Sequence, residues 1–405
     1  MAKTEETKIQ IPEVAPELIK RPSENAIDYP IGNGKRRLEI CIGALNYKDN
    51  YEDDNEPYKP IDLTWKDNKI TKAPYTLERI GNKIIVLDKK SGKTGTIELT
   101  DIGATKLSAA AIGGIKSSEV VKDVDVEIIP APDSIRFQTV IKDETALAEL
   151  KYKVSGDIPI KYSAVDADGD AVPLITSLSK GVLTESVDAK SFTSLDEKKT
   201  AIKYPIKIDP TLTIQGSGED TDIAEGAKTS NYGSQTYMRL DAYSGDARRG
   251  LVKMSLSELP AGAVISTAVF SIYYYYKSIG DPNGEACTLY KLRRSDWVEA
   301  QATWNIYKTS NNWGTAGAGN TSTDIDTSIT AATTFPASYG WLDFDAKSIV
   351  EDAVANSLDF NVRISTAASG DYPRVYSKEY NTDTTRRPKL VIDYTEGKKA
   401  KIIIF

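Results

Sequence analysis

Residues 267–276 read TAVFSIYYYY, a run of β-branched and aromatic side chains that favours a β-strand. The turn residues Asp281-Pro282-Asn283-Gly284 follow, and residues 287–292 form a second strand-like run. Together they predict a β-hairpin. Further strand-like runs recur roughly every 8–12 residues, separated by Gly, Pro, Asn and Asp, which is the spacing of a β-sandwich. The sequence therefore predicts an antiparallel β-sandwich of the jelly-roll type over residues 209–396.

The same region holds six ordered groups of residues that form a family pattern. They are Asp220-Thr221-x-Ile223, Asn231-Tyr232-Gly233-Ser234, Leu259-Pro260-Ala261-Gly262-Ala263-x-Ile265-Ser266-x-Ala268, Trp297-x-Glu299 with Thr303-Trp304-Asn305, Gly340-Trp341-x-x-Phe344-Asp345, and Ser377-x-Glu379 leading to Arg387-Pro388-x-Leu390. In these residues the chain resembles the DNRLRE-type jelly-roll module, which is grouped with carbohydrate-binding modules and occurs in bacterial surface proteins. The resemblance implies a binding or structural module rather than a catalyst.

The length of 405 residues suggests two or three domains, since single domains usually hold about 100–200 residues. Charged residues make up 27% of the chain, as in ordinary globular proteins. The net charge of −7 opposes binding to nucleic acid or to an anionic membrane. No apolar run approaches the length of about 20 residues that spans a membrane, and none follows Lys3 as a Sec-type signal would.

The N-terminal half predicts three further segments. Residues 1–33 carry Pro12, Pro16, Pro22 and Pro30 among charged residues, which predicts an extended arm, either a solvated tail or a strap across a neighbouring subunit. Residues 34–120 predict a small β-domain. Residues 121–208 predict a second β-domain or a continuation of the first. The expected fold class is all-β, with tandem β-domains ending in the jelly roll.

The C-terminal segment, residues 397–405, ends in the apolar run Ile402-Ile403-Ile404-Phe405. An exposed apolar strand promotes aggregation, so we expect this one to be buried against its own domain or a neighbouring subunit. The segment therefore predicts assembly, as a homo-oligomer or with other structural subunits.

Catalysis has little support in the residue types. The sequence has no histidine, which removes the commonest general base and most transition-metal sites. It has no G-x-S-x-G elbow and no phosphate-binding glycine loop. We expect a protein that is not an enzyme; a glycosidase, which needs only two carboxylates, is the weaker alternative.

One calcium site is suggested by Asp166, Asp168 and Asp170, which alternate around Gly169 like the first half of an EF-hand loop. An Asp-Gly hairpin turn explains the same residues without metal. A second set of acids, Asp220, Asp222, Asp343 and Asp345, could also converge on an ion or remain solvated.

Sugar binding is suggested by aromatic residues in predicted loops. Flat rings pack on pyranose faces, while amides and carboxylates bind hydroxyl groups. The candidates are Trp313, Tyr243, Tyr307 and Tyr372, with Asn311, Asn312, Asp246 and Asp371 beside them. Three tryptophans that fall in the family pattern, Trp297, Trp304 and Trp341, are expected in the core. Two of the four tyrosines 273–276 should point outward from their strand.

Two functions follow. The first is a non-catalytic structural surface protein of a virion or extracellular filament, assembled through its terminal segments, whose jelly roll binds glycans. The second is a carbohydrate-binding module of a bacterial cell-surface or exported protein. Both place the protein at a virion or extracellular surface with polysaccharide as the expected partner.

Overall fold

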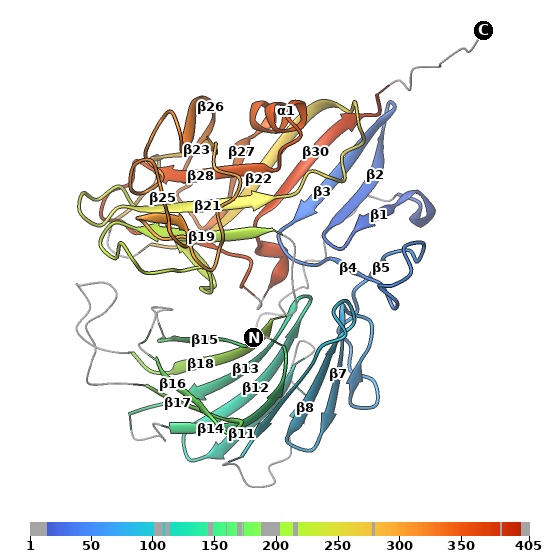
Figure 1. The fold of residues 1–405 in the computed structure, drawn as a ribbon, viewed down its shortest axis with the longest axis vertical. Helices are drawn as coiled ribbons and strands as arrows, with labels where there is room; N and C mark the ends of the chain where they lie inside the picture. Colours follow the sequence, from blue (N-terminus) through green and yellow to red (C-terminus); the bar gives the residue numbers. More distant parts are fainter. Residues whose placement is uncertain are drawn as a thin grey trace. The chain divides into compact units, whose positions relative to one another are not determined.

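The fold is that of a computed structural model, which describes residues 14–100, 108–109, 114–144, 149–158, 160–167, 172, 174–187, 203–213, 218–277, 280–380 and 383–397. The chain divides into two compact units: unit 1 comprises Met1–Gly43 and Ser217–Phe405, and unit 2 comprises Ala44–Gly216. Unit 2 is thus inserted in the chain of unit 1. Both units consist of antiparallel β-sheets, which confirms the predicted fold class (Figure 1).

Unit 1 is a sandwich of an eight-stranded and a five-stranded sheet. The larger sheet has the order β1 (Lys20–Ser23), β2 (Ala26–Gly32), β3 (Lys35–Cys41), β30 (Lys389–Thr395), β22 (Val264–Tyr276), β29 (Arg374–Tyr376) and β20 (Tyr237–Arg239), and β27 (Gly340–Asp345) also pairs with β22. The smaller sheet has the order β19 (Glu219–Ala224), β21 (Arg248–Met254), β28 (Phe360–Thr366), β23 (Ala286–Leu292) and β26 (Ile325–Thr334).

Strand β22 is the long strand at the centre of the larger sheet and contains residues 267–276. The predicted hairpin with residues 287–292 is wrong, because those residues belong to β23, which pairs with β26 and β28 in the smaller sheet. Strand β22 pairs with β30 along its first half and with β27 and β29 further on. Because successive side chains of a strand alternate between faces, Phe270, Ile272 and Tyr274 all enter the core. That core also contains Leu289 and Ile364 of the smaller sheet, so the two sheets pack face to face.

The N-terminal segment differs from the predicted arm over 1–33. Residues Lys20–Ser23 and Ala26–Gly32 form β1 and β2, and β3 pairs with β30, with Leu38 opposite Ile392. Proline is tolerated here because β1 is the edge strand and its last partner in β2 is Asp28, which leaves Pro30 beyond that pairing. The N-terminal strands therefore extend the sandwich of unit 1.

Unit 2 is one sandwich and not two domains divided near residue 120. One sheet has the order β10 (Ser108–Ala109), β11 (Ile115–Val121), β12 (Val124–Ala131), β13 (Ser134–Ile141), β18 (Ile206–Thr213) and β15 (Ile160–Val165). The other has the order β16 (Leu174–Ser179), β17 (Val182–Val187), β14 (Glu149–Gly156), β9 (Thr94–Leu99), β8 (Lys83–Asp88), β7 (Tyr75–Ile80) and β6 (Lys69–Ile70). Pairing of β9 with β14 joins the two predicted segments, and Val86 and Phe137 share one core.

The remaining elements are short. They are the strand pairs β4 (Asn46–Tyr47) with β5 (Lys59–Pro60) and β24 (Ile306–Lys308) with β25 (Asn311–Asn312), the helix α1 (Lys347–Ala355), and the 3₁₀ turns η1 (Pro16–Leu18) and η2 (Thr384–Arg386). In the described part of the chain, no helix has the length and hydropathy needed to span a membrane.

Candidate functional site

Four loops connect the two sheets of unit 1 at one end of the sandwich. They follow β20, β22, β26 and β28, and together we call their described residues the four-loop end: residues 240–247, 277, 280–285, 335–339 and 367–373. The strand register places them together, because Thr366 pairs with Cys287 while Ala286 pairs with Thr334. The sheets thus bring four sequence-distant loops to one surface, where binding residues commonly lie.

Asp241 joins two of these loops. Its side chain is 2% exposed and accepts backbone N–H groups from Tyr243 in its own loop and from Gly370 and Tyr372 in the loop after β28. Burial raises the pKa of this carboxyl, and the three N–H donors oppose that shift. The carboxylate therefore fixes the backbone beside Tyr243.

Two tyrosine rings at the four-loop end are open to solvent. Tyr243 is 46% exposed and Tyr339 is 52% exposed, and these are the most exposed aromatic side chains among the described residues. The ring of Tyr339 packs edge to face against the core ring of Tyr274. The two ring centroids are 5.2 Å apart, and the ring planes are nearly perpendicular. Such rings offer flat apolar faces with a polar hydroxyl at the edge, which suits the face of a sugar.

Carboxylates also occur in the loops of the four-loop end. Asp281 is exposed and pairs with Lys277 at 2.8 Å, and burial together with the charges of Asp281 and Asp371 raises the pKa of Tyr274. The loop of Asp371 approaches Gly280 so closely that a Cβ there would lie 1.5 Å from Asp371 Oδ1. The four-loop end thus combines aromatic faces with hydrogen-bond acceptors for hydroxyl groups.

Most of the aromatic residues predicted to bind sugar are instead buried. Trp313 is 4% exposed and Tyr307 is 7% exposed, and they pack at 5.5 Å in a small core with Trp297 and Trp304. The Trp313 indole N–H donates to Thr303 O at 2.9 Å. The prediction that these rings are exposed was wrong, because the connection that carries them packs on Ile223 and Leu251 of the smaller sheet, where its rings form a core. Trp313 and Tyr307 therefore cannot stack on a glycan.

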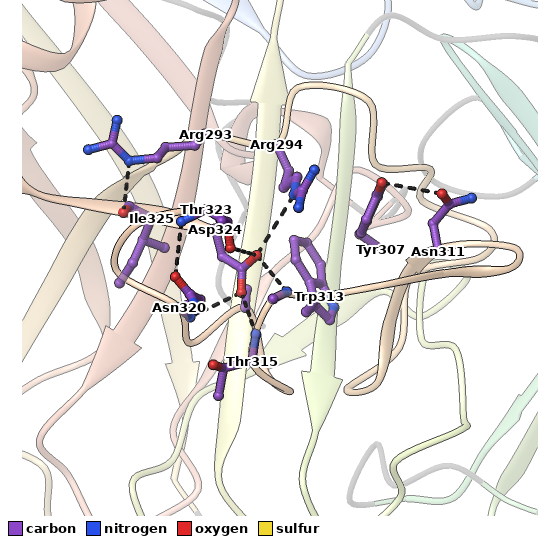
Figure 2. A network of polar contacts seen from close by, with 12 residues as sticks. Arg293, Arg294, Tyr307, Asn311, Trp313, Thr315, Asn320, Thr323, Asp324 and Ile325 are labelled. Carbon is purple, nitrogen blue, oxygen red and sulfur yellow. Dashed lines mark hydrogen bonds and ion pairs between the residues drawn. The ribbon is translucent and has the colours of Figure 1, made fainter.

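Figure 2 shows what holds this connection in place. Asp324 is fully buried and accepts backbone N–H groups from Gly314 at 2.8 Å and from Thr315 and Asn320 at 3.0 Å. The Arg294 guanidinium lies 3.8 Å from the same carboxylate. Because the polar groups of this network bind one another, the network stabilises the fold of the connection.

The other residues predicted to bind sugar differ in their exposure to solvent. Tyr372 is 7% exposed and donates its hydroxyl to Asp246 Oδ2 at 3.2 Å, so its ring is unavailable. Asn311 accepts the Tyr307 hydroxyl at 3.4 Å, and Asn312 is exposed on β25. Only Tyr243 of the four predicted rings is exposed. Tyr339 was not predicted from the sequence, although Pro336 and Ser338 before Gly340 indicate an exposed loop.

A second aromatic group lies on the outer face of the larger sheet. Tyr275 stacks on Tyr376 at 4.0 Å, and Tyr376 stacks on Tyr380 at 3.5 Å. Tyr273 and Tyr275 are half-buried on this face while Tyr274 enters the core, as strand alternation predicts. Because these rings cover one another's faces, the group stabilises the sheet and offers little ring surface to a sugar.

The predicted calcium and assembly residues lie largely outside the described residues. Asp166 is 3% exposed and accepts the Lys203 N–H at 3.3 Å. Asp168, Asp170 and the assembly residues Ile402, Ile403, Ile404 and Phe405 lie outside the described residues. Calcium binding at the first site and assembly through the C-terminus therefore stay predictions.

Comparison with known proteins finds a family model that is similar to one part of the chain. Residues 220–392 match the family model of the disaggregatase related repeat domain. The match begins in β19 and ends in β30, so it covers the β-rich part of unit 1 but neither β1–β3 nor unit 2. No curated protein matches the chain.

One matching solved structure is the crystal structure of the GH31 alpha-xylosidase from Xanthomonas citri. It is 7% identical with a TM-score of 0.10, and the match covers 94% of this chain and 38% of that chain. The chain thus spans well under half of that protein's length. A TM-score this low carries no argument about fold or function.

Proposed function

We propose that the chain is a non-catalytic surface protein, of a virion, a filament or a cell, whose unit 1 sandwich binds glycans at the four-loop end. The observation that carries the proposal is the pair of exposed rings, Tyr243 and Tyr339, on loops that the core and Asp241 hold in place. A site whose loops are already fixed loses little entropy when it binds, which favours affinity.

The resemblance to DNRLRE-type jelly-roll modules supports the same function, because those modules are grouped with carbohydrate-binding modules. The residue types also support a binder over an enzyme: the sequence has no histidine, and the carboxylate Asp241 is engaged by backbone N–H groups. Within this proposal the four-loop end recognises the sugar, and the sandwich of unit 1 displays the four-loop end.

The test is binding of the full chain to a broad panel of polysaccharides. We expect at least one neutral or acidic polysaccharide to bind, with no release of reducing ends. Truncation of an anchoring aromatic residue commonly costs 1.4 kcal/mol or more, so Tyr243→Ala and Tyr339→Ala should each weaken binding about tenfold.

Leu358→Ala is the matched control, because Leu358 is a 40% exposed apolar residue in the connection between α1 and β28, away from the four loops. Equal binding by all three variants would contradict the proposed site. Turnover of a polysaccharide would contradict the non-catalytic assignment.

A further inference from the structure

Three acidic side chains of unit 1 converge at a place that the proposed glycan site does not use. One carboxylate oxygen each of Asp220, Glu299 and Glu379 lies within 4.8 Å of the others. Asp220 is in β19, Glu299 follows Trp297 in the connection after β23, and Glu379 follows β29. Among the described residues this is the group of acids close enough to share an ion, and Asp222, Asp343 and Asp345 of the sequence prediction are not in it.

Asp220 supplies a second observation. It is fully buried, and its Oδ2 accepts the Lys378 backbone N–H at 2.8 Å. Its other oxygen, Oδ1, is buried without any hydrogen-bond partner. A buried carboxylate oxygen with no partner is costly, so native structures normally give such an atom a donor or a cation.

Negative charge predominates around Asp220. Lys378 brings an ammonium group to the cluster: its Nζ lies 2.6 Å from Glu299 Oε2 and donates to Gly218 O at 3.2 Å. Burial, followed by the charges of Glu379 and Glu299, raises the pKa of Asp220 well above its usual range.

We propose that Asp220, Glu299 and Glu379 bind a divalent cation, with calcium the ion that fits. Calcium binds carboxylate oxygens at about 2.3–2.6 Å, so two ligands on opposite sides of one ion lie up to roughly 5 Å apart, which accommodates the separation found here. Two positive charges would offset the negative charge around Asp220, and Asp220 Oδ1 would gain its partner. The bound ion would tie β19 to the segments that carry Glu299 and Glu379.

The experiment is calorimetric titration of the full chain with calcium chloride after treatment with EDTA, together with thermal unfolding with and without the ion. Saturation at about one hundred times the dissociation constant should raise the unfolding midpoint of a unit of this size by roughly 5–10 °C. Asp220→Asn and Glu379→Gln should each abolish most of the binding heat and the shift. Asn at position 220 keeps an oxygen for the Lys378 N–H, so this variant should fold.

Asp359→Asn is the control, because Asp359 is exposed and lies outside the cluster. It should bind calcium as the wild type does. The proposal is overturned if wild-type protein shows neither heat nor a midpoint shift, or if both persist in the Asp220→Asn and Glu379→Gln variants.

Discussion

Replacing Asp241 with alanine should have two effects at once. It should destabilise unit 1, and it should release the loops of the proposed glycan site. The substitution leaves the N–H groups of Tyr243, Gly370 and Tyr372 without their acceptor. Hydrogen bonds to a charged group contribute about 1.5–3 kcal/mol each, and burial of the carboxylate offsets part of that sum. We therefore expect unit 1 to lose about 3–5 kcal/mol of unfolding free energy, a large effect for a single substitution.

Urea denaturation followed by tryptophan fluorescence measures this loss, since Trp297, Trp304, Trp313 and Trp341 all lie in unit 1. Asp241→Asn keeps one oxygen acceptor and should lose less than Asp241→Ala. Asp281→Ala, at an exposed position of the same end, should change stability by less than about 0.5 kcal/mol. A loss below about 1 kcal/mol for Asp241→Ala would refute the role given to this carboxylate.

Three further predictions concern other parts of the chain. Asp324→Ala should cost roughly 3 kcal/mol and shift tryptophan emission to the red, because three backbone N–H groups around Trp313 lose their acceptor; unchanged emission would contradict this. Burial raises the pKa of Asp222 to about 6 in the folded protein. The protonated side chain therefore contributes to the free energy of unfolding, and this contribution is fully present below about pH 4 and is lost as pH rises through about 6. Thermal unfolding should then show a higher midpoint at pH 5 than at pH 7, with a smaller difference in Asp222→Asn; a flat profile in the wild type would refute it. Removal of residues 398–405 should convert a defined oligomer into monomers in light scattering, and a monomer before and after removal would contradict assembly through this segment.

Local patterns predicted the strands of unit 1 well. Residues 267–276 alternate between faces as their sequence indicates, and Trp297 and Trp304 are buried as expected. These predictions succeeded because strand periodicity and turn residues act over short distances. Trp341 is only half-buried, since it lies on the outer face of β27 beneath Lys389.

Pairings between distant segments could not be predicted in this way. β3 pairs with β30 across some 350 residues of chain, including all of unit 2, and no local pattern specifies that partner. The prolines of residues 1–33 favoured an extended arm over strands. Proline is tolerated at a sheet edge, but whether a segment lies at an edge depends on which strand pairs with it, and the local sequence does not show that partner.

The candidate sites show the same limit. A loop rich in aromatic residues was interpreted as a sugar-binding surface, whereas Trp313 and Tyr307 form a core with residues of four strands of the smaller sheet. The three acids of the proposed cation site each occur in a segment of the family pattern, at Asp220, Glu299 and Glu379. Their convergence depends on the fold, so the sequence alone could not group them.

Calorimetric titration of the full chain with the polysaccharide identified on the panel tests the central claim most directly. The comparison is between wild type, the Tyr243→Ala/Tyr339→Ala double variant and Leu358→Ala, each confirmed as folded by its unfolding midpoint. The proposed site predicts that the double variant loses about a hundredfold or more in affinity while Leu358→Ala binds like the wild type. Wild-type affinity in the folded double variant would contradict glycan binding at the four-loop end.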